Sequence, residues 1–415
     1  MSTWIVIGSA NGSGNLGDEA MWHAAVRELR RAAGDVEILT DSPDGSWGAD
    51  GVPGVSELPY LYTTLQPFPA GERSRIAAVR LAAKILGRPI RWAAARRRYT
   101  RALRGPRGRL QQQWYDAIRT SSGVIVSGAG AITDRYAVNG VYAWSLLIHW
   151  ARELGRPVAV LGQGVGPLSP RHIDVASAGL KAADFVGVRD ERSADVARSW
   201  GVTEPVVQPD WATLAVPSDD DRRRAAALAD DVGAPFLAVC VHTVNAESHD
   251  RDLRRALDSI GAFARERGLR VLLVPNMHGQ GANSDQATMR RLLAGLSPER
   301  RTVFQTIDER LNARLTRALL SHAELVVASR YHSLVFAGAE GRWTVGLALD
   351  DYWSQKLLGA QRASGQRTHV VNVRDASGDL ERHLTEALAS AATQKLSGID
   401  GSAAAEDLRR FVSAS

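Results

Sequence analysis

Short apolar segments alternate with longer amphipathic segments along most of the chain. The short segments are continuously apolar, which is typical of strands in a parallel sheet that helices cover on both faces. In the first half, the expected strands are Trp4–Gly8, Val36–Thr40, Val124–Ser127, Val158–Leu161, Phe185–Arg189 and Pro205–Gln208. The helices expected between them include Asp18–Arg31, Tyr142–Leu154 and Glu191–Trp200.

The pattern is interrupted at 217–224, where turn-forming and charged residues gather, and then starts again. The later strands are expected at Phe236–Val241, Arg270–Pro275, Thr302–Gln305, Leu325–Ala328, Thr344–Leu347 and His369–Val373. Two such runs predict two doubly wound, Rossmann-like α/β domains with a ligand-binding cleft between them. We expect the N-terminal domain at 1–216 and the C-terminal domain at 235–375. The segment 376–415 is expected to hold a helix at Leu380–Ala391 that crosses back onto the first domain, and a tail.

Bulk composition agrees with a two-domain globular protein. The chain has 415 residues, 45% of them hydrophobic and 23% charged. Its single cysteine, Cys240, excludes a disulfide framework and lies in an apolar run, so we interpret it as a buried structural thiol. No apolar stretch approaches a membrane span, and the N-terminus lacks the layout of a signal peptide, so the cytoplasm is the expected location.

Positive charge is concentrated in the segment 73–109, which holds twelve arginines, one lysine and no acidic residue. The whole chain carries +6, so the remainder sums to −7. Apolar residues such as Ile85 and Trp92 among these arginines indicate either a helix lying on an anionic membrane surface or a solvated basic insert. No nucleic-acid-binding motif accompanies the segment, so we expect no nucleic-acid partner.

The loop after the first strand carries a dinucleotide-like glycine pattern at Gly12, Gly14 and Gly17, with Asp41 at the end of the next strand. Two carboxylates, Asp18 and Glu19, follow the last glycine. They occupy the helix N-terminus where a pyrophosphate would bind. We therefore expect this loop to meet hydroxyl groups rather than phosphates.

Other polar or glycine-rich clusters also follow strands. Ser127–Asp134 follows the third strand, and its alternative interpretation is a tight strand-to-helix turn. Gln163, in the glycine-rich stretch after the fourth strand, offers donors and an acceptor to hydroxyls. Arg189 ends the fifth strand, either pointing into the cleft or pairing with Asp190 or Glu191.

The stretch Ser329–Leu334 follows the strand Leu325–Ala328 and contains Arg330 and His332. In an extended chain these two side chains share one side. A guanidinium binds an oxyanion pair in fork geometry, and an imidazole exchanges protons near neutral pH. This pairing suits a phosphorylated carboxylate. There is no zinc-type ligand spacing, H-E-x-x-H, G-x-S-x-G or P-loop lysine, and we expect no metal and no resident cofactor.

Together, in this order, these segments resemble the polysaccharide pyruvyl transferase family. The matching pieces are Gly14–Ala20, Ser127–Asp134, Pro157–Pro167, Val188–Ser193, Pro209–Asp210 and Ser329–Ala337, and Asp350–Lys356 is a loose match. The resemblance spans roughly 4–350. It implies a GT-B-like pair of Rossmann-like domains and transfer of pyruvate from phosphoenolpyruvate, a co-substrate, to hydroxyls of a saccharide. Such a reaction belongs to cell-surface polysaccharide or glycolipid biosynthesis.

By position, the resemblance implies that Arg189, Arg330 and His332 bind phosphoenolpyruvate and catalyse the transfer. The other roles are hypotheses from the residue types at each loop. His332, Asp18 and Glu19 are the expected catalytic residues, with His332 as general acid and one of the two carboxylates as base. Donor-binding residues are Arg189, Arg330, Tyr331 and Ser333. Acceptor-binding residues are Asn15, Gly17, Gly128, Gly130, Asp134, Gln163 and Gly164. If the segment 73–109 binds membrane, the acceptor is a lipid-linked saccharide and the enzyme is peripheral at the inner face of the cell membrane.

Three alternatives remain open from the residues. The first is a nucleotide-sugar glycosyltransferase on the same two-domain plan, with Arg330 and His332 holding the nucleotide. The second is an NAD(P)-dependent oxidoreductase that uses Gly12–Gly17 and Asp41. The third is a sugar-binding protein without catalytic activity.

Overall fold

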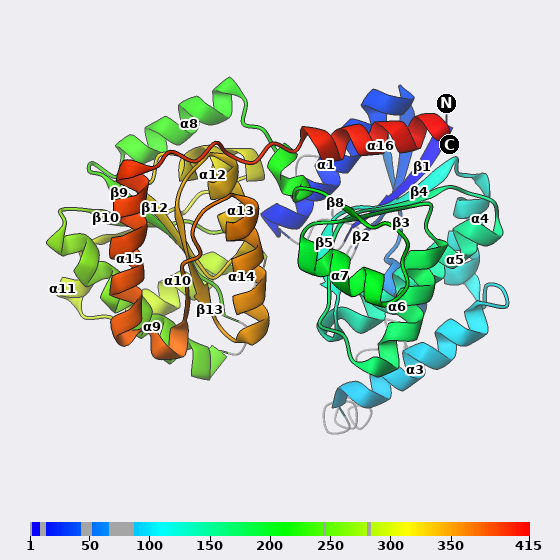
Figure 1. The fold of residues 1–415 in the computed structure, drawn as a ribbon, viewed down its shortest axis with the longest axis horizontal. Helices are drawn as coiled ribbons and strands as arrows, with labels where there is room; N and C mark the ends of the chain where they lie inside the picture. The colour runs from blue at the N-terminus through cyan, green and yellow to red at the C-terminus, as the bar shows by residue number, and fades with distance from the viewer. Residues whose placement is uncertain (1, 9–13, 43–51, 66–86, 244–245, 280–283) are drawn as a thin grey trace. The chain divides into compact units, whose positions relative to one another are not determined.

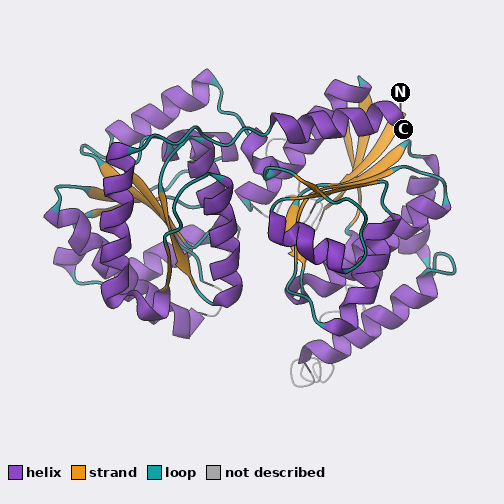
Figure 2. Cartoon of the chain, viewed as in Figure 1, coloured by secondary structure: helices purple, strands orange, loops and turns teal. Residues whose placement is uncertain are grey.

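A computed structural model describes residues 2–8, 14–42, 52–65, 87–243, 246–279 and 284–415. Within these residues the chain forms two compact units. The first comprises the described residues of 1–12, together with 21–211 and 402–415. The second comprises 13–20 and 212–401. Each unit has a parallel sheet flanked by helices (Figure 2), so the predicted α/β class with two Rossmann-like sheets is confirmed.

The N-terminal sheet runs in the order β3-β2-β1-β4-β6-β7-β8, and β5 pairs with β6 beside this path. Its strands are β1 (Ser2–Ile7), β2 (Val36–Ser42), β3 (Val55–Pro59), β4 (Gly123–Val126), β5 (Ala129–Ile132), β6 (Val158–Val165), β7 (Phe185–Val188) and β8 (Val206–Val207). Its α-helices are α1 (Leu16–Ala33), α3 (Gly87–Ala102), α4 (Arg109–Thr120), α5 (Trp144–Glu153), α6 (Pro170–Ala182), α7 (Glu191–Ser199) and α16 (Ser402–Ala414). The described part of the unit also has three short 3₁₀ helices, η1 (Leu61–Leu65), η3 (Asp134–Tyr136) and η5 (Trp211–Leu214), and the π-helix η4 (Ala137–Ala143).

The C-terminal sheet runs in the order β11-β10-β9-β12-β13-β14. Its strands are β9 (Phe236–Cys240), β10 (Arg270–Leu273), β11 (Phe304–Thr306), β12 (Leu325–Ala328), β13 (Thr344–Ala348) and β14 (Val370–Asn372). Its helices are α8 (Asp219–Asp230), α9 (Ala246–Glu266), α10 (Asp285–Ala294), α11 (Pro298–Arg301), α12 (Ala313–Leu320), α13 (Tyr331–Ala339), α14 (Asp351–Ala363) and α15 (Ala376–Thr393), with a short turn η7 (Val373–Asp375).

Every strand expected from the apolar pattern is present, although β6 runs on to Val165. The glycine-rich stretch after β4, expected as a turn, forms the additional strand β5, which pairs through Ala129 and Ile132 with β6. The small and apolar side chains of this stretch let it pair closely with β6. The strand has only four residues, which are too few to show the alternation of apolar and polar positions that identifies a strand.

The helix expected to cross back does not do so. α15 packs on α9 within the C-terminal unit, and the later helix α16 is the segment that returns to the N-terminal unit. Figure 1 shows α16 at the N-terminal unit. There Arg409 of α16 pairs with Glu28 of α1 at 3.1 Å. Among the described residues, no helix is both long and apolar enough to span a membrane.

Candidate active site

The carboxyl edge of the C-terminal sheet brings the most reactive side chains together. The chain leaves β9 toward β10 on one side and returns to β12 on the other, so the switch point lies between β9 and β12. His242 follows β9, and Ser329–His332 follow β12. The Ser329 hydroxyl lies 2.9 Å from the backbone nitrogen of His242 and 2.8 Å from its Nδ1, which ties the two strand ends together.

His332 lies in the first turn of α13 and is 7% exposed. Its imidazole meets the Tyr331 ring edge-on at 5.0 Å and lies 6.5 Å from the ring of Phe336, measured between ring centroids. This packing restricts the orientation of the imidazole. A fixed imidazole at a switch point is suited to general acid–base chemistry.

The loop before α1 belongs to the C-terminal unit and lies against His332. Leu16 donates its backbone N–H to Asn276 at 3.1 Å, and Gly14 accepts from the backbone of His278 at 2.8 Å. A Cβ on Gly17 would lie 1.9 Å from Cγ of His332. Only glycine permits so close an approach, so two motifs over three hundred positions apart in sequence form one site.

The two carboxylates of this loop help to shape it. Glu19 accepts a hydrogen bond from the backbone N–H of Gly14 at 2.8 Å, and Asp18 accepts one from the Asn15 amide at 2.8 Å. Both side chains are only partly buried. These two bonds order the loop at the start of α1.

Arg330 is held by a residue that the sequence did not single out. Its Nε and Nη2 donate to the two oxygens of Asp285, at 3.1 and 2.5 Å. The side chain of Asp285 is 2% exposed and that of Arg330 is 15% exposed. Asp285 also accepts from the backbone N–H of Asn276 at 3.0 Å. Arg330 is therefore a positioned guanidinium whose charge is partly neutralised, because Asp285 engages one of its edges.

A second cation lies on α14. The ammonium of Lys356 lies 5.3 Å from the ring centre of Tyr331, 5.6 Å from that of Tyr352 and 5.0 Å from that of Trp353. Trp353 also packs edge-on against His242 at 4.6 Å. Aromatic faces favour an ammonium, so these rings hold Lys356 beside the switch point. The only sequence signal for this lysine was its place in the loosely matching stretch Asp350–Lys356.

Ser333 and Cys240 lie beneath the site rather than at its surface. Both are fully buried. Burial raises the pKa of the Cys240 thiol to about 12, although its contact with the Ser333 hydroxyl acts in the opposite direction. The interpretation of Cys240 as a buried thiol is confirmed. The donor-binding role expected for Ser333 requires an exposed hydroxyl, which this placement does not provide.

In the N-terminal unit, the expected donor and acceptor residues have structural partners. Arg189 is 7% exposed and lies over Gly164, where an added Cβ would come within 2.5 Å of Nη2. Its Nε is 3.7 Å from Asp190, which caps α7 through the backbone of Ser193 at 2.7 Å. Gly164 thus makes room for the Arg189 guanidinium, and its contact with an acceptor stays a prediction.

The structure differs from the expectation for Gln163. This side chain is fully buried and donates to the backbone carbonyls of Ser127 and Leu161, at 2.7 and 3.2 Å. Its amide nitrogen joins β6 to the end of β4, whereas its Oε1 is buried and accepts no hydrogen bond from any described residue. Gly128 likewise packs at the core, with an added Cβ 2.7 Å from the sulfur of Met21, whereas Gly130 is half-buried within β5.

The dinucleotide interpretation also meets a physical obstacle. Asp41 is 2% exposed and accepts from the backbone N–H of Leu61 at 3.3 Å, so its carboxylate is turned toward η1 rather than toward a ribose. Gly14 and Gly17 are close to His278 and His332, not to an open surface. Gly12 lies outside the described residues.

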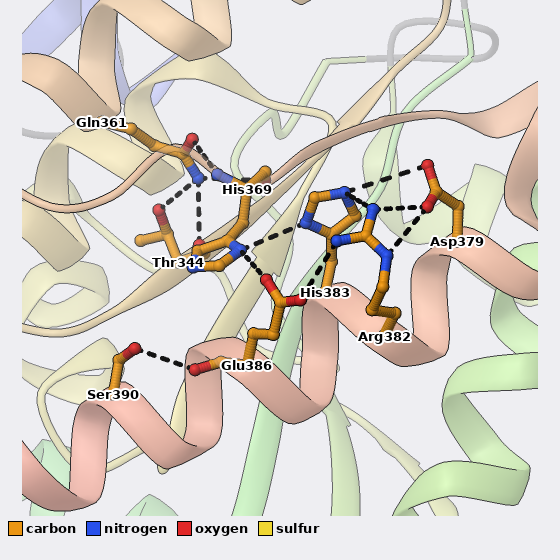
Figure 3. A network of polar contacts seen from close by, with 8 residues as sticks. All are labelled: Thr344, Gln361, His369, Asp379, Arg382, His383, Glu386 and Ser390. Atoms are coloured by element: carbon orange, nitrogen blue, oxygen red, sulfur yellow. Dashed lines mark hydrogen bonds and ion pairs between the residues drawn. The ribbon is translucent and has the colours of Figure 1, made fainter.

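Among the described residues, one group places metal-ligating atoms near one another: His369, His383 and Glu386, within 4.8 Å (Figure 3). Arg382 Nη2 lies 3.1 Å from Nε2 of His383. A guanidinium only donates, so Nε2 accepts and Nδ1–H of His383 donates to Nδ1 of His369 at 3.1 Å. Desolvation lowers the pKa of both histidines. Hydrogen bonds join the side chains of this group, although Nε2 of His369 is buried and has no hydrogen-bond partner among the described residues, and we assign the group a structural role.

The described part of the basic segment turns its apolar side inward. In α3, Ala95, Tyr99 and Ala102 are buried, and Trp92 packs against the same core. This arrangement leaves mainly arginines outside, so from residue 92 onward the helix lacks an apolar face that could enter a membrane. Residues 73–86 lie outside the described residues.

Comparison with known proteins adds a family and a fold. The model of the polysaccharide pyruvyl transferase family matches residues 15–351. UDP-GlcNAc 2-epimerase from Methanocaldococcus jannaschii has a TM-score of 0.61 at 11% identity, with both chains covered fully. The epimerase from Neisseria meningitidis gives 0.59 at 9%, again with full coverage. Trehalose 6-phosphate synthase from Burkholderia multivorans gives 0.53 at 14%, covering 100% of this chain and 95% of that one. These likenesses establish a GT-B-like fold. No curated protein matches this sequence significantly.

Proposed function

This chain belongs to the polysaccharide pyruvyl transferase family, a family of transferases, and from that premise we propose that it moves pyruvate from phosphoenolpyruvate onto hydroxyls of a saccharide. The observation that supports the proposal most directly is the cluster of His332, Arg330 and Lys356 at the switch point of the C-terminal sheet. An imidazole beside two cations suits a donor that carries a phosphate and a carboxylate on an enol.

In the proposed reaction, Arg330 and Lys356 bind the anionic groups of the donor. Asp285 positions Arg330 so that its remaining donors are presented in a fixed direction. His332 protonates the methylene carbon of phosphoenolpyruvate, which becomes the methyl group of the product. The resulting positive centre at C2 is attacked by a sugar hydroxyl, whose proton passes to Asp18 or Glu19.

Ketal formation then needs a second hydroxyl. The C2–O bond to phosphate breaks and inorganic phosphate leaves with the bonding pair. The second hydroxyl attacks C2, and its proton ends on the phosphate. One phosphoenolpyruvate and one diol thus give one ketal and one phosphate. Arg189, on the N-terminal unit, remains a predicted second guanidinium for the donor.

The test is phosphate release from phosphoenolpyruvate in the presence of a saccharide, with mass spectrometry of the saccharide product. Loss of the general acid should lower kcat by about 10²–10⁴-fold in His332→Ala. The matched control is His322→Ala, at an exposed histidine of the same unit. Near-normal turnover in His332→Ala would remove the imidazole from the mechanism. To find the base, Asp18→Asn is compared with Glu19→Gln.

The fold shared with UDP-GlcNAc 2-epimerases favours one alternative, use of a nucleotide sugar by the same switch point. The similarity to these solved structures concerns the fold alone. Incubation with UDP-GlcNAc and a saccharide separates the two reactions, because a glycosyltransferase releases UDP whereas a pyruvyl transferase releases phosphate from phosphoenolpyruvate.

A further inference from the structure

A pocket of about 260 Å³ opens in the N-terminal unit, beyond the carboxyl ends of β3 and β5. It is lined chiefly by Tyr60, Tyr62, Trp92, Asp134, Tyr136 and Asn139. Its volume is near the lower end of the ~300–1,000 Å³ of small-molecule sites, so it suits one or two small rings. Ligands of doubly wound sheets bind at this edge.

The pocket wall is built by an unusual helix. Residues 137–143 form the π-helix η4, which continues into α5. Gly140 lets it pack against β5, since a Cβ there would lie 2.1 Å from the backbone oxygen of Ala131. π-helical turns are rare and are frequent at functional sites. Here the π-helix carries Asn139 into the lining.

Aromatic rings surround the opening. Trp92 from α3 is half-buried, packs edge-on with His172 at 4.8 Å, and has the guanidinium of Arg171 over its ring at 5.4 Å from the centroid. The Tyr60 and Tyr62 rings lie 5.9 Å apart. Tyr136 remains 45% exposed. Exposed aromatic faces in a concave site offer apolar planes on which the C–H faces of a sugar ring can stack.

The polar groups of the pocket suit hydroxyls. Asn139 donates through Nδ2 to the Tyr60 hydroxyl at 3.1 Å, whereas its Oδ1 is buried and accepts no hydrogen bond from any described residue. A buried acceptor without a donor is costly, and a ligand hydroxyl would supply that donor. Asp134 already accepts from the backbone N–H of Ser169 at 2.9 Å. Arg135 also lines the pocket, so the described lining holds one acidic and one basic side chain and carries no net charge that would favour an ionic ligand.

We propose that this pocket binds a neutral sugar ring of the saccharide acceptor, with Trp92 and Tyr136 stacking on the ring and Asn139 Oδ1 accepting from a hydroxyl. The assignment of this sugar as the acceptor rests on the proposed function. Asp134 lines the pocket as well as accepting hydrogen bonds from Ser169, so its carboxylate is placed to contact a ligand in the pocket. The inference rests on one exposed and one half-buried aromatic ring and on an unsatisfied acceptor that line the same concavity.

Saturation-transfer NMR tests the pocket without donor or turnover. The probes are the methyl glycosides of glucose, galactose, mannose and N-acetylglucosamine. We expect at least one to bind the wild type, with Kd rising about tenfold or more in Trp92→Leu and in Tyr136→Ala, because a central aromatic contact is worth over 1 kcal/mol. Trp92→Phe should retain part of the affinity. The matched control, Phe411→Ala, removes a half-buried ring of the same unit outside the pocket.

Unchanged affinity in Tyr136→Ala and Trp92→Leu would overturn the proposal, and so would absence of binding of all four glycosides by the wild type. Tyr136 is exposed enough for its variant to fold, which circular dichroism verifies. Glycoside binding that depends on the pocket, without phosphate release from phosphoenolpyruvate, would refute the proposed reaction but not the pocket. Turnover whose acceptor KM is unaltered in these variants would refute the pocket but not the reaction.

Discussion

Gly17→Ala is the substitution that most directly tests how the candidate active site is assembled. The new methyl carbon would lie 1.9 Å from Cγ, 2.0 Å from Nδ1 and 2.5 Å from Cβ of His332. Ordinary contact begins at 3.4 Å, so the start of α1 and the imidazole must separate by about 1.5 Å. Overpacking of this kind typically costs about 1–3 kcal/mol. We therefore expect a lower melting temperature, by roughly 2–4 °C for each kcal/mol.

Without the imidazole, Gly17→Ala should no longer lower the stability of the protein. In a His332→Gly background the three clashing atoms are gone, and alanine is the better helix former by about 1 kcal/mol. Gly17→Ala should there be neutral or stabilising. A double-mutant cycle by urea unfolding measures this coupling, expected at about 1–3 kcal/mol. Gly378→Ala, at a helical glycine with open space around it, is the matched control.

Activity provides a second readout. Moving a catalytic group by about 1 Å costs on the order of 10²-fold in rate, so kcat for phosphate release should fall on that scale in Gly17→Ala. If Gly17→Ala alone is as stable and as active as the wild type, the close packing of the first loop on His332 is refuted. Equal destabilisation in both backgrounds would assign the cost to the loop alone.

Three further predictions follow from burial. Asp285→Asn should lower the free energy of unfolding by about 3 kcal/mol or more, because it leaves the mostly buried Arg330 without its counter-charge. Its control is Asp308→Asn, in an exposed ion pair, which should cost less than about 1 kcal/mol in the same urea titration. Cys240, with a thiol pKa of about 12, should not react with a thiol reagent at pH 8 until the protein unfolds, and rapid labelling of the native chain would contradict this. Burial raises the pKa of Asp41 from 3.8 to about 7, so the folded protein binds the extra proton, and stability should fall as pH rises between these values. The melting temperature of Asp41→Asn should exceed that of the wild type increasingly over this range, and a constant difference would count against a raised pKa.

The fold class could be predicted from the sequence because its signals are local. An apolar strand such as Val124–Ser127 and a helix such as Glu191–Trp200 are each recognisable from a few neighbouring residues. The motifs follow strands, and parallel strands place their carboxyl ends at one edge, so the side of each sheet that carries the chemistry was predictable as well. Two of the described strands were not predicted, namely β3 at Val55–Pro59 and the short β5, in which glycine and alanine give no clear period.

The candidate site depended on contacts that no local pattern contains. Nothing near Asp285 in sequence indicates that it holds Arg330, and the burial of Gln163 depends on β4 and β6 lying side by side. The sequence by itself determined two Rossmann-like units and the residue types available at their strand ends. The contact of the loop at Gly17 with His332 follows only from the tertiary structure. It brings two segments far apart in sequence so close together that no residue larger than glycine fits at position 17.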